Sequence, residues 1–129
     1  MHDLQTIIEQ AFENRANITP VMTDLNVKNA VQKTIDLLNT GKIRVAEKIN
    51  GVWQTHQWIK KAVLLFFRTN DNQVMDAGCL QFYDKVPLKF NRESTAEFTN
   101  LGVRVVPSAI ARYGAYIAPN TVLMPSYVN

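Results

Sequence analysis

The 129-residue chain is poor in cysteine, glycine and proline, and it has no long apolar run. Its one cysteine cannot form an intramolecular disulfide, and the N-terminus lacks the basic stretch and apolar segment of a secretory signal, so we expect a cytoplasmic protein. The longest apolar run, residues 62–67, is far shorter than a bilayer requires, which predicts no membrane span. Sparse glycine and proline with dispersed charge also argue against a disordered chain.

A cluster of positive charge is missing as well, although the net charge is +3 and the pI is about 9.1. A nucleic-acid interface would need lysines and arginines gathered on one segment and interleaved with aromatic residues. We therefore expect no nucleic-acid partner. An acidic small molecule, a coenzyme with phosphates and simple solubility are all compatible with the excess charge.

Metal-binding and thiol chemistry have little support in the sequence. His2 and His56 are the only histidines, and no HxxxH or CxxC spacing is present, so we expect no metal site. Cys79 has no neighbouring histidine to lower its pKa and is expected to be a partly buried spectator. The rings of Trp53 and Trp58 are expected to fill a core.

Three segments have the apolar periodicity of amphipathic helices. The first is expected to begin with Asp3 as its N-cap and to end before Thr19-Pro20, and the second to run from about Asn26 to a left-handed stop at Gly41. The third is expected to begin with Thr55 as its cap and to end near residues 70–72. We expect the first two helices to pack together.

Turn signals divide the remainder of residues 1–102. Asn50-Gly51 predicts a hairpin between residues 43–49 and a strand that begins at Val52. Residues 73–91 suggest extended chain in which Pro87 confines any strand to an edge. Ser94 and Glu97 have the spacing of a capping box, which predicts a short helix that ends at Gly102, with a strand over residues 103–106.

From Val105 onward the chain divides into the six-residue units VVPSAI, ARYGAY, IAPNTV and LMPSYV. This period is typical of a β-helix, in which the apolar first residue of each unit points into a narrow core. The sequence thus predicts an α+β protein with a mainly helical domain over residues 1–102 and the first coil of a β-helix over 103–129. Because coils bury their apolar surface only when stacked, we expect a truncated solenoid. The first positions are Val105, Ala111, Ile117 and Leu123, and the fifth are Ala109, Ala115, Thr121 and the divergent Tyr127.

Four stretches, in this order, carry a resemblance to a known family: GxxRVAEKINGVWQTHQWIKKAVLL at 41–65, NDNQV at 70–74, FYDKVPLKF at 82–90 and RVVPSAIARYGAYIAPNTVLMPSYVN at 104–129. They resemble the tetrahydrodipicolinate N-succinyltransferases, and the similarity covers the whole chain. The resemblance implies a helical N-terminal domain, a left-handed parallel β-helix, homotrimers formed side by side and active sites between neighbouring subunits.

The resemblance also implies a reaction in lysine and diaminopimelate biosynthesis. The family transfers a succinyl group from the co-substrate succinyl-CoA to the amino group of ring-opened tetrahydrodipicolinate, a dicarboxylate, without a tightly bound cofactor. Arg104 matches the family arginine that binds this substrate, and its planar fork suits a carboxylate. Because the catalytic acids and the CoA contacts of the family lie on later coils, no catalytic or cofactor-binding residue is assigned here, and this chain alone is expected to be inactive.

Two questions stay open at the level of sequence. Tyr113, Tyr116 and Tyr127 fit a substrate cleft and intersubunit packing equally well. The alternative to an enzyme fragment is a stand-alone oligomerisation or interaction module without catalysis. Such a module would be expected to end in a polar cap, whereas this sequence ends in LMPSYVN, which favours the fragment.

Overall fold

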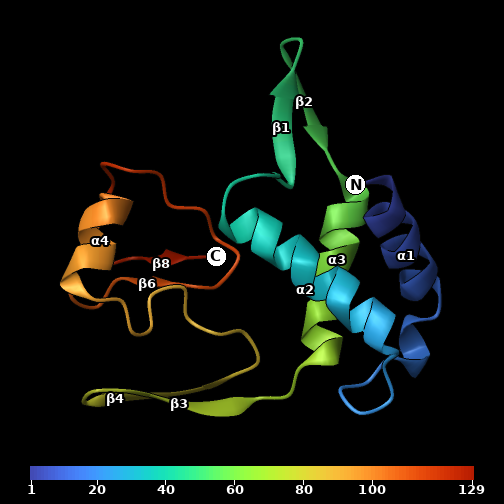
Figure 1. Cartoon of the computed structure of the whole chain (residues 1–129), viewed down its shortest axis with the longest axis horizontal. Helices are drawn as coiled ribbons and strands as arrows, with labels where there is room; N and C mark the ends of the chain where they lie inside the picture. The colour runs from blue at the N-terminus through green and yellow to red at the C-terminus, as the bar shows by residue number, and fades with distance from the viewer.

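The computed structural model describes residues 1–129 as an α+β protein with four α-helices, one 3₁₀ turn and eight short strands (Figure 1). Helices α1 (His2–Glu13), α2 (Leu25–Asn39) and α3 (Gln57–Thr69) contact one another in all three pairings, and the 3₁₀ turn Arg15–Asn17 follows α1. The predicted packing of the first two helices is confirmed. No helix has the length and apolar character needed to cross a membrane.

The main core lies between these three helices and comprises 14 buried apolar residues. Eleven of its members lie on α1, α2 and α3, and Ile8, Ile59 and Leu65 are almost fully buried. Removing such side chains from water is the main favourable term that holds the helices together. The other members are Ala11, Ile18, Ala30, Val31, Ile35, Leu38, Ile43, Trp58, Ala62, Phe66 and Val86.

Two of the predicted helix caps are wrong. Asp3 lies in the first turn of α1, where its carboxylate still favours the positive end of the helix dipole, and Met1 is the N-cap. Thr55 pairs with Ala46 in the hairpin, so α3 begins after His56 instead. The predicted left-handed stop after α2 is confirmed, because Gly41 has φ of +73°.

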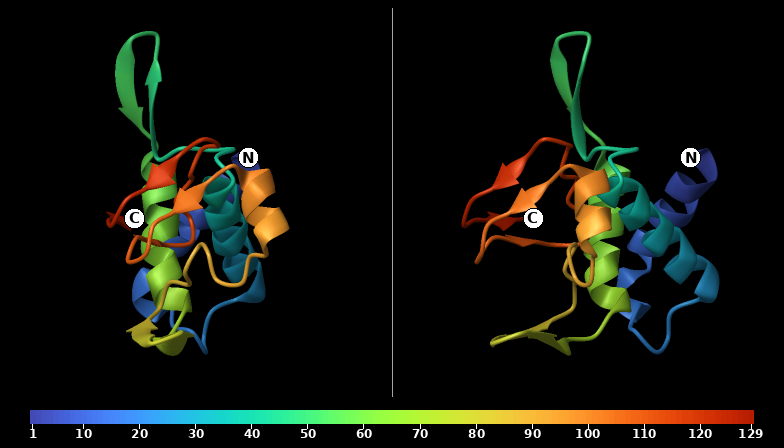
Figure 2. Two further views of the ribbon diagram at one scale, coloured as in Figure 1. Left: turned by 90° about the vertical axis from the view of Figure 1, so that its left-hand side faces the viewer. Right: turned by 60° about the vertical axis from the view of Figure 1, so that its left-hand side comes forward.

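Strands β1 (Ala46–Ile49) and β2 (Val52–Thr55) form the predicted hairpin. Asn50 and Gly51 have φ of +49° and +81°, as a type I′ turn requires. The hairpin stands away from the helical body (Figures 1 and 2). The expectation that Trp53 fills a core is therefore wrong, since its side chain is 69% exposed, whereas Trp58 is buried as expected.

A second antiparallel hairpin consists of β3 (Gln73–Ala77) and β4 (Leu80–Asp84), where the sequence indicated only extended chain. Its turn uses Gly78 at φ of +64°. Cys79 at this turn is exposed, so its expected partial burial is wrong.

Helix α4 (Thr95–Leu101) confirms the capping-box prediction. The Ser94 hydroxyl accepts a hydrogen bond from the Glu97 amide, the Glu97 carboxylate accepts one from the Ser94 amide, and Gly102 ends the helix in the left-handed region. The rings of Phe90 and Phe98 lie with centroids 5.4 Å apart, so α4 packs on the segment that precedes it.

The hexapeptide segment forms two short parallel ladders. Strand β5 (Arg104–Val105) pairs with β7 (Val122–Leu123), a spacing of three hexapeptides, and β6 (Ile110–Ala111) pairs with β8 (Tyr127–Val128). Of the four first positions predicted to point inward, Ala111 and Leu123 are buried, and Val105 and Ile117 are half-buried.

Candidate functional site

Arg104 lies at the start of β5, two residues after the left-handed glycine that ends α4. Its amide donates a 3.0 Å hydrogen bond to the carbonyl of Thr121, which fixes the backbone of the arginine against β7. Its side chain is exposed. The two ion pairs in the chain, His56 with Glu47 and Arg112 with Asp84, do not include it, so its guanidinium is available to an anion.

A shallow depression of about 460 Å³ surrounds Arg104. Helix α4 forms one wall and the β5–β7 ladder forms the other. Arg104 is its one titratable residue, so the depression offers a positive charge for a carboxylate but no side chain able to act as a general base. The remaining lining residues are Thr95, Phe98, Thr99, Gly102, Val103, Asn120, Thr121 and Val122.

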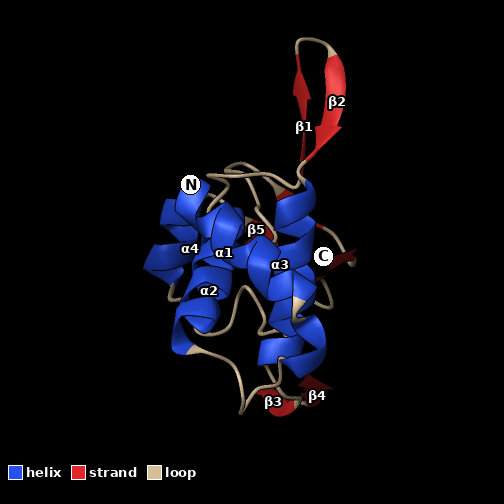
Figure 3. Ribbon diagram, turned by 90° about the vertical axis from the view of Figure 1, so that its right-hand side faces the viewer, coloured by secondary structure: helices blue, strands red, loops and turns tan.

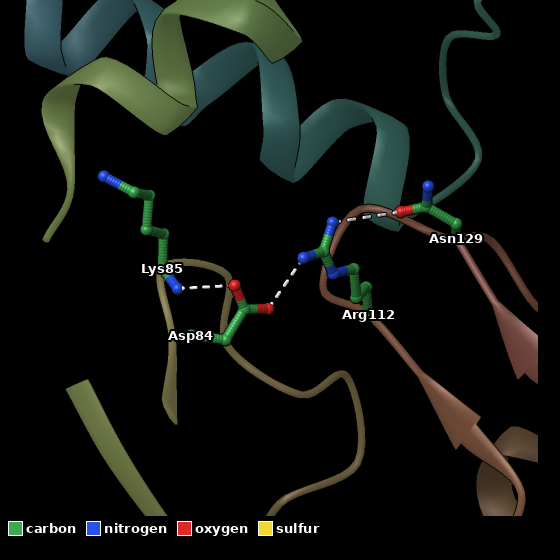
Figure 4. Close-up of polar contacts among 4 residues, drawn as sticks. All are labelled: Asp84, Lys85, Arg112 and Asn129. Atoms are coloured by element: carbon green, nitrogen blue, oxygen red, sulfur yellow. Dashed lines mark hydrogen bonds and ion pairs between the residues drawn. The ribbon is translucent and has the colours of Figure 1, made fainter. Parts of the chain in front are cut away.

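Arg112 forms a contact that the sequence did not reveal. Its Nη2 donates to Asp84 Oδ2 at 2.7 Å and its Nη1 to Asn129 Oδ1 at 3.5 Å (Figure 4). The guanidinium also lies 5.7 Å from the centroid of the Phe67 ring. Arg112 therefore joins the hexapeptide segment to the β3–β4 hairpin and to α3.

The Asp84 carboxyl group responds to two opposing effects. Burial raises its pKa, but hydrogen bonds from Arg112 and from the amides of Lys85 and Val86, together with the arginine charge, outweigh burial and lower the pKa below its usual value. The carboxylate is therefore ionised at neutral pH and holds Arg112 by a charge-assisted bond.

The C-terminal half of α2 provides a second anchor for the hexapeptide segment. The Tyr113 hydroxyl donates to Asp36 Oδ1 at 2.9 Å, and the Gly114 amide donates to Asn39 Oδ1 at 3.0 Å. Burial, followed by the hydrogen bond and the charge of Asp36, raises the pKa of Tyr113, so the phenol stays neutral.

Lys89 completes this anchor. Its ammonium group donates to the Asn39 carbonyl at 2.8 Å and to Asn39 Oδ1 at 2.9 Å. Burial lowers the pKa of Lys89, while the charge of Glu93 acts in the opposite direction. A cation at the C-terminal end of α2 also faces the negative end of the helix dipole.

These contacts give the three hexapeptide tyrosines different environments. Tyr113 is engaged inside the chain by Asp36, a role that the sequence did not suggest. Tyr116 is 44% exposed and its ring lies over Gly41, while Tyr127 is 59% exposed. Substrate contact and subunit packing therefore remain as alternatives for Tyr116 and Tyr127.

The structure brings together no group of three His, Cys, Asp or Glu side chains in a metal-binding arrangement. His56 Nε2 lies 3.7 Å from Glu47 Oε1 at the base of the first hairpin, and Cys79 is exposed at the tip of the second. Both residues lie outside the Arg104 depression.

Comparison with known proteins gives one consistent family. Residues 3–69 match the family described as tetrahydrodipicolinate N-succinyltransferase N-terminal. The proteins named 2,3,4,5-tetrahydropyridine-2,6-dicarboxylate N-succinyltransferase from Edwardsiella ictaluri and Yersinia enterocolitica are each 60% identical over all 129 residues, which cover 47% of their length. The protein of that name from Bordetella pertussis is 63% identical over 127 residues, which are 98% of this chain and 46% of that protein. The chain spans about half the length of the curated relatives it matches, and it belongs to the tetrahydrodipicolinate N-succinyltransferase family through the N-terminal domain.

Proposed function

We propose that this chain is the N-terminal portion of a succinyl-CoA-dependent N-succinyltransferase of lysine and diaminopimelate biosynthesis. The acceptor is the amino group of ring-opened tetrahydrodipicolinate, and the co-substrate is succinyl-CoA. The observation that carries this proposal is the 60–63% identity, extending over essentially the whole chain, to proteins that bear the name of this activity.

The proposed architecture has a helical domain over residues 1–102 and the start of a left-handed parallel β-helix over 103–129. The two parallel ladders, of which β5–β7 has a spacing of three hexapeptides, and the buried positions of Ala111 and Leu123 support this division. We propose that the complete protein is a cytoplasmic homotrimer with side-by-side β-helices and active sites between subunits.

The proposed role of Arg104 is to bind a carboxylate of the acceptor. Its exposed guanidinium has no carboxylate partner in the chain, and the adjacent depression leaves room for a ligand. Positioning the acceptor in this way would bring its amino group to the thioester and stabilise the complex by charge-assisted hydrogen bonds. Catalytic groups would come from outside this chain, so the chain alone is proposed to be inactive.

A chimera tests the assignment. This chain is joined to the remaining half of the Edwardsiella ictaluri relative, and CoA release is measured with and without Arg104→Ala. Loss of the carboxylate contact is expected to raise the KM for the acceptor by about 10- to 100-fold and to leave the KM for succinyl-CoA nearly unchanged. Arg68→Ala, which removes an exposed arginine at the end of α3, is the matched control.

The outcomes separate the two parts of the proposal. An active chimera in which Arg104→Ala leaves every parameter unchanged would reject the role of Arg104 but keep the activity. An inactive chimera that still folds and trimerises would reject the activity. Turnover of succinyl-CoA by the 129-residue chain alone would contradict the assignment of catalysis to residues outside it. Calorimetric titration of this chain with the dicarboxylate analogue pimelate reports whether a partial site forms around Arg104.

A further inference from the structure

Two exposed β-hairpins project from opposite ends of the molecule (Figures 1 and 3). They differ in charge. Residues 42–55, which contain β1 and β2, have three cationic side chains, Lys42, Arg44 and Lys48, and one acidic side chain, Glu47. Residues 71–84, which contain β3 and β4, have three aspartates and no lysine or arginine.

The β1–β2 hairpin leaves apolar surface in water. Lys48 and Trp53 are opposite each other across the two strands, so their side chains share one face. Trp53 is 69% exposed and the neighbouring Val52 64% exposed. The principal contacts of the two strands are with each other, and a two-stranded hairpin of this kind is only marginally stable in water. A surface that covers Trp53 would therefore stabilise the hairpin.

The outer face of the β3–β4 hairpin complements the first hairpin. Val74 is opposite Tyr83, and Asp76 is opposite Gln81, so all four side chains share the exposed face. Asp76 accepts a 3.1 Å hydrogen bond from Gln81 Nε2 and belongs to no ion pair. On the β3–β4 hairpin, an apolar patch of Val74 and Tyr83 thus lies beside the carboxylate of Asp76, which forms no ion pair. On the β1–β2 hairpin, Trp53 lies beside the ammonium group of Lys48, which also forms no ion pair. The two faces are therefore complementary in charge and both are partly apolar.

We propose that the β1–β2 hairpin of one copy docks on the outer face of the β3–β4 hairpin of a second copy of this chain. Trp53 would pack on Val74 and Tyr83, and Lys48 would pair with Asp76. Aromatic packing supplies most of the association energy at such a contact, while the charges fix its register and exclude a hairpin from pairing with its own like-charged counterpart.

The position of the hairpins determines the kind of assembly. Because they lie at opposite ends of the molecule, the two surfaces cannot meet within one copy (Figure 1). Each copy would therefore offer one hairpin to each of two neighbours. Such a head-to-tail contact closes into a ring when the rotation that relates one copy to the next completes a full circle. This inference concerns assembly and does not depend on the proposed transfer reaction.

Charge exchange tests the contact in the 129-residue chain. Sedimentation velocity over a range of concentrations is expected to show self-association that weakens at high salt. Lys48→Glu and Asp76→Lys should each weaken association by about tenfold or more, since each places like charges together. The double variant should recover most of the lost affinity. Lys33→Glu, on an exposed position of α2, is the control and should have little effect.

Fluorescence of Trp53 locates the interface. Trp58→Phe leaves Trp53 as the one tryptophan of the chain. Its emission is expected to shift to shorter wavelength with increasing concentration, and the shift should be lost in the Asp76→Lys variant. A chain that stays monomeric at all concentrations, or a double charge variant as weak as either single variant, would overturn the proposal. So would association that leaves the emission of Trp53 unchanged.

Discussion

Gly41 is the residue at which local conformation and long-range packing coincide. Its φ of +73° lies in the left-handed region, and an added Cβ would lie 2.7 Å from Cγ of Tyr116. The position thus requires glycine for two separate reasons, backbone strain and the ring above it. Gly78, at φ of +64°, has open space around it and requires glycine for the first reason alone.

Gly41→Ala is expected to lower the free energy of unfolding by about 2–4 kcal/mol, because it adds a clash with an aromatic ring to left-handed strain. Gly78→Ala is the matched control and should cost about 1 kcal/mol, which is the strain by itself. Urea denaturation of both variants measures the difference. Equal losses would show that the Tyr116 ring moves aside without cost.

At the scale of elements, the Arg112–Asp84 pair connects the hexapeptide segment to the β3–β4 hairpin. The side chains are 20% and 35% exposed, so solvent screens part of their attraction. Burial raises the pKa of Asp84, and the hydrogen bond from Arg112 is the strongest effect that lowers it. Removing the arginine therefore keeps the first effect and abolishes the second.

Arg112→Met is therefore expected to raise the pKa of Asp84 and to lower stability at neutral pH by about 1 kcal/mol. A lowered carboxyl pKa contributes stability that is present above the unfolded value of 3.8 and is lost as pH falls through the folded pKa. The part of the stability that is lost on acidification should therefore be smaller in the Arg112→Met variant. NMR titration of the Asp84 carboxyl carbon measures the shift, with Arg15→Met as the control, since Arg15 belongs to no ion pair. An unchanged pKa would mean that the backbone amides alone hold the carboxylate.

At the scale of the whole molecule, stability is expected to be uneven. Fourteen buried apolar residues hold α1, α2 and α3 together, whereas each strand of the hexapeptide segment is two residues long and pairs with one neighbour. Few buried contacts and short ladders are typical of regions that open without global unfolding.

Hydrogen exchange should reveal this difference. The amides of Arg104, Val106, Ile110 and Arg112 donate to backbone carbonyls of the hexapeptide segment, yet they are expected to exchange at least about tenfold faster than the central amides of α3. Native-state exchange followed by NMR measures both sets. Equal protection would indicate instead that the anchors at α2 and Asp84 make the molecule one cooperative unit.

Local chemistry allowed several elements to be predicted from the sequence. Asn50-Gly51 specified a type I′ turn, Ser94 with Glu97 specified a capping box, and Gly102 specified the end of α4, each through conformational preferences that act within a few residues. Apolar periodicity predicted the helical stripes, and it also predicted Ala111 and Leu123, the two first positions of the hexapeptides that are buried. Arg104 was identified by resemblance, and its role stays a prediction.

What the sequence determined by itself was therefore the set of elements, the positions of most turns and the family. Only the tertiary structure decided that Trp53 stays in solvent, that residues 73–84 fold as a second hairpin, and that Tyr113 and Arg112 serve as anchors. The partners of these anchors lie 77 and 28 residues away along the chain, and Asn39 lies 50 residues from Lys89. Local propensity carries no information about such pairs, because they form only when the packed helices bring distant polar groups together. Burial removes water from these groups, and each group then replaces the hydrogen bond that its partner has lost.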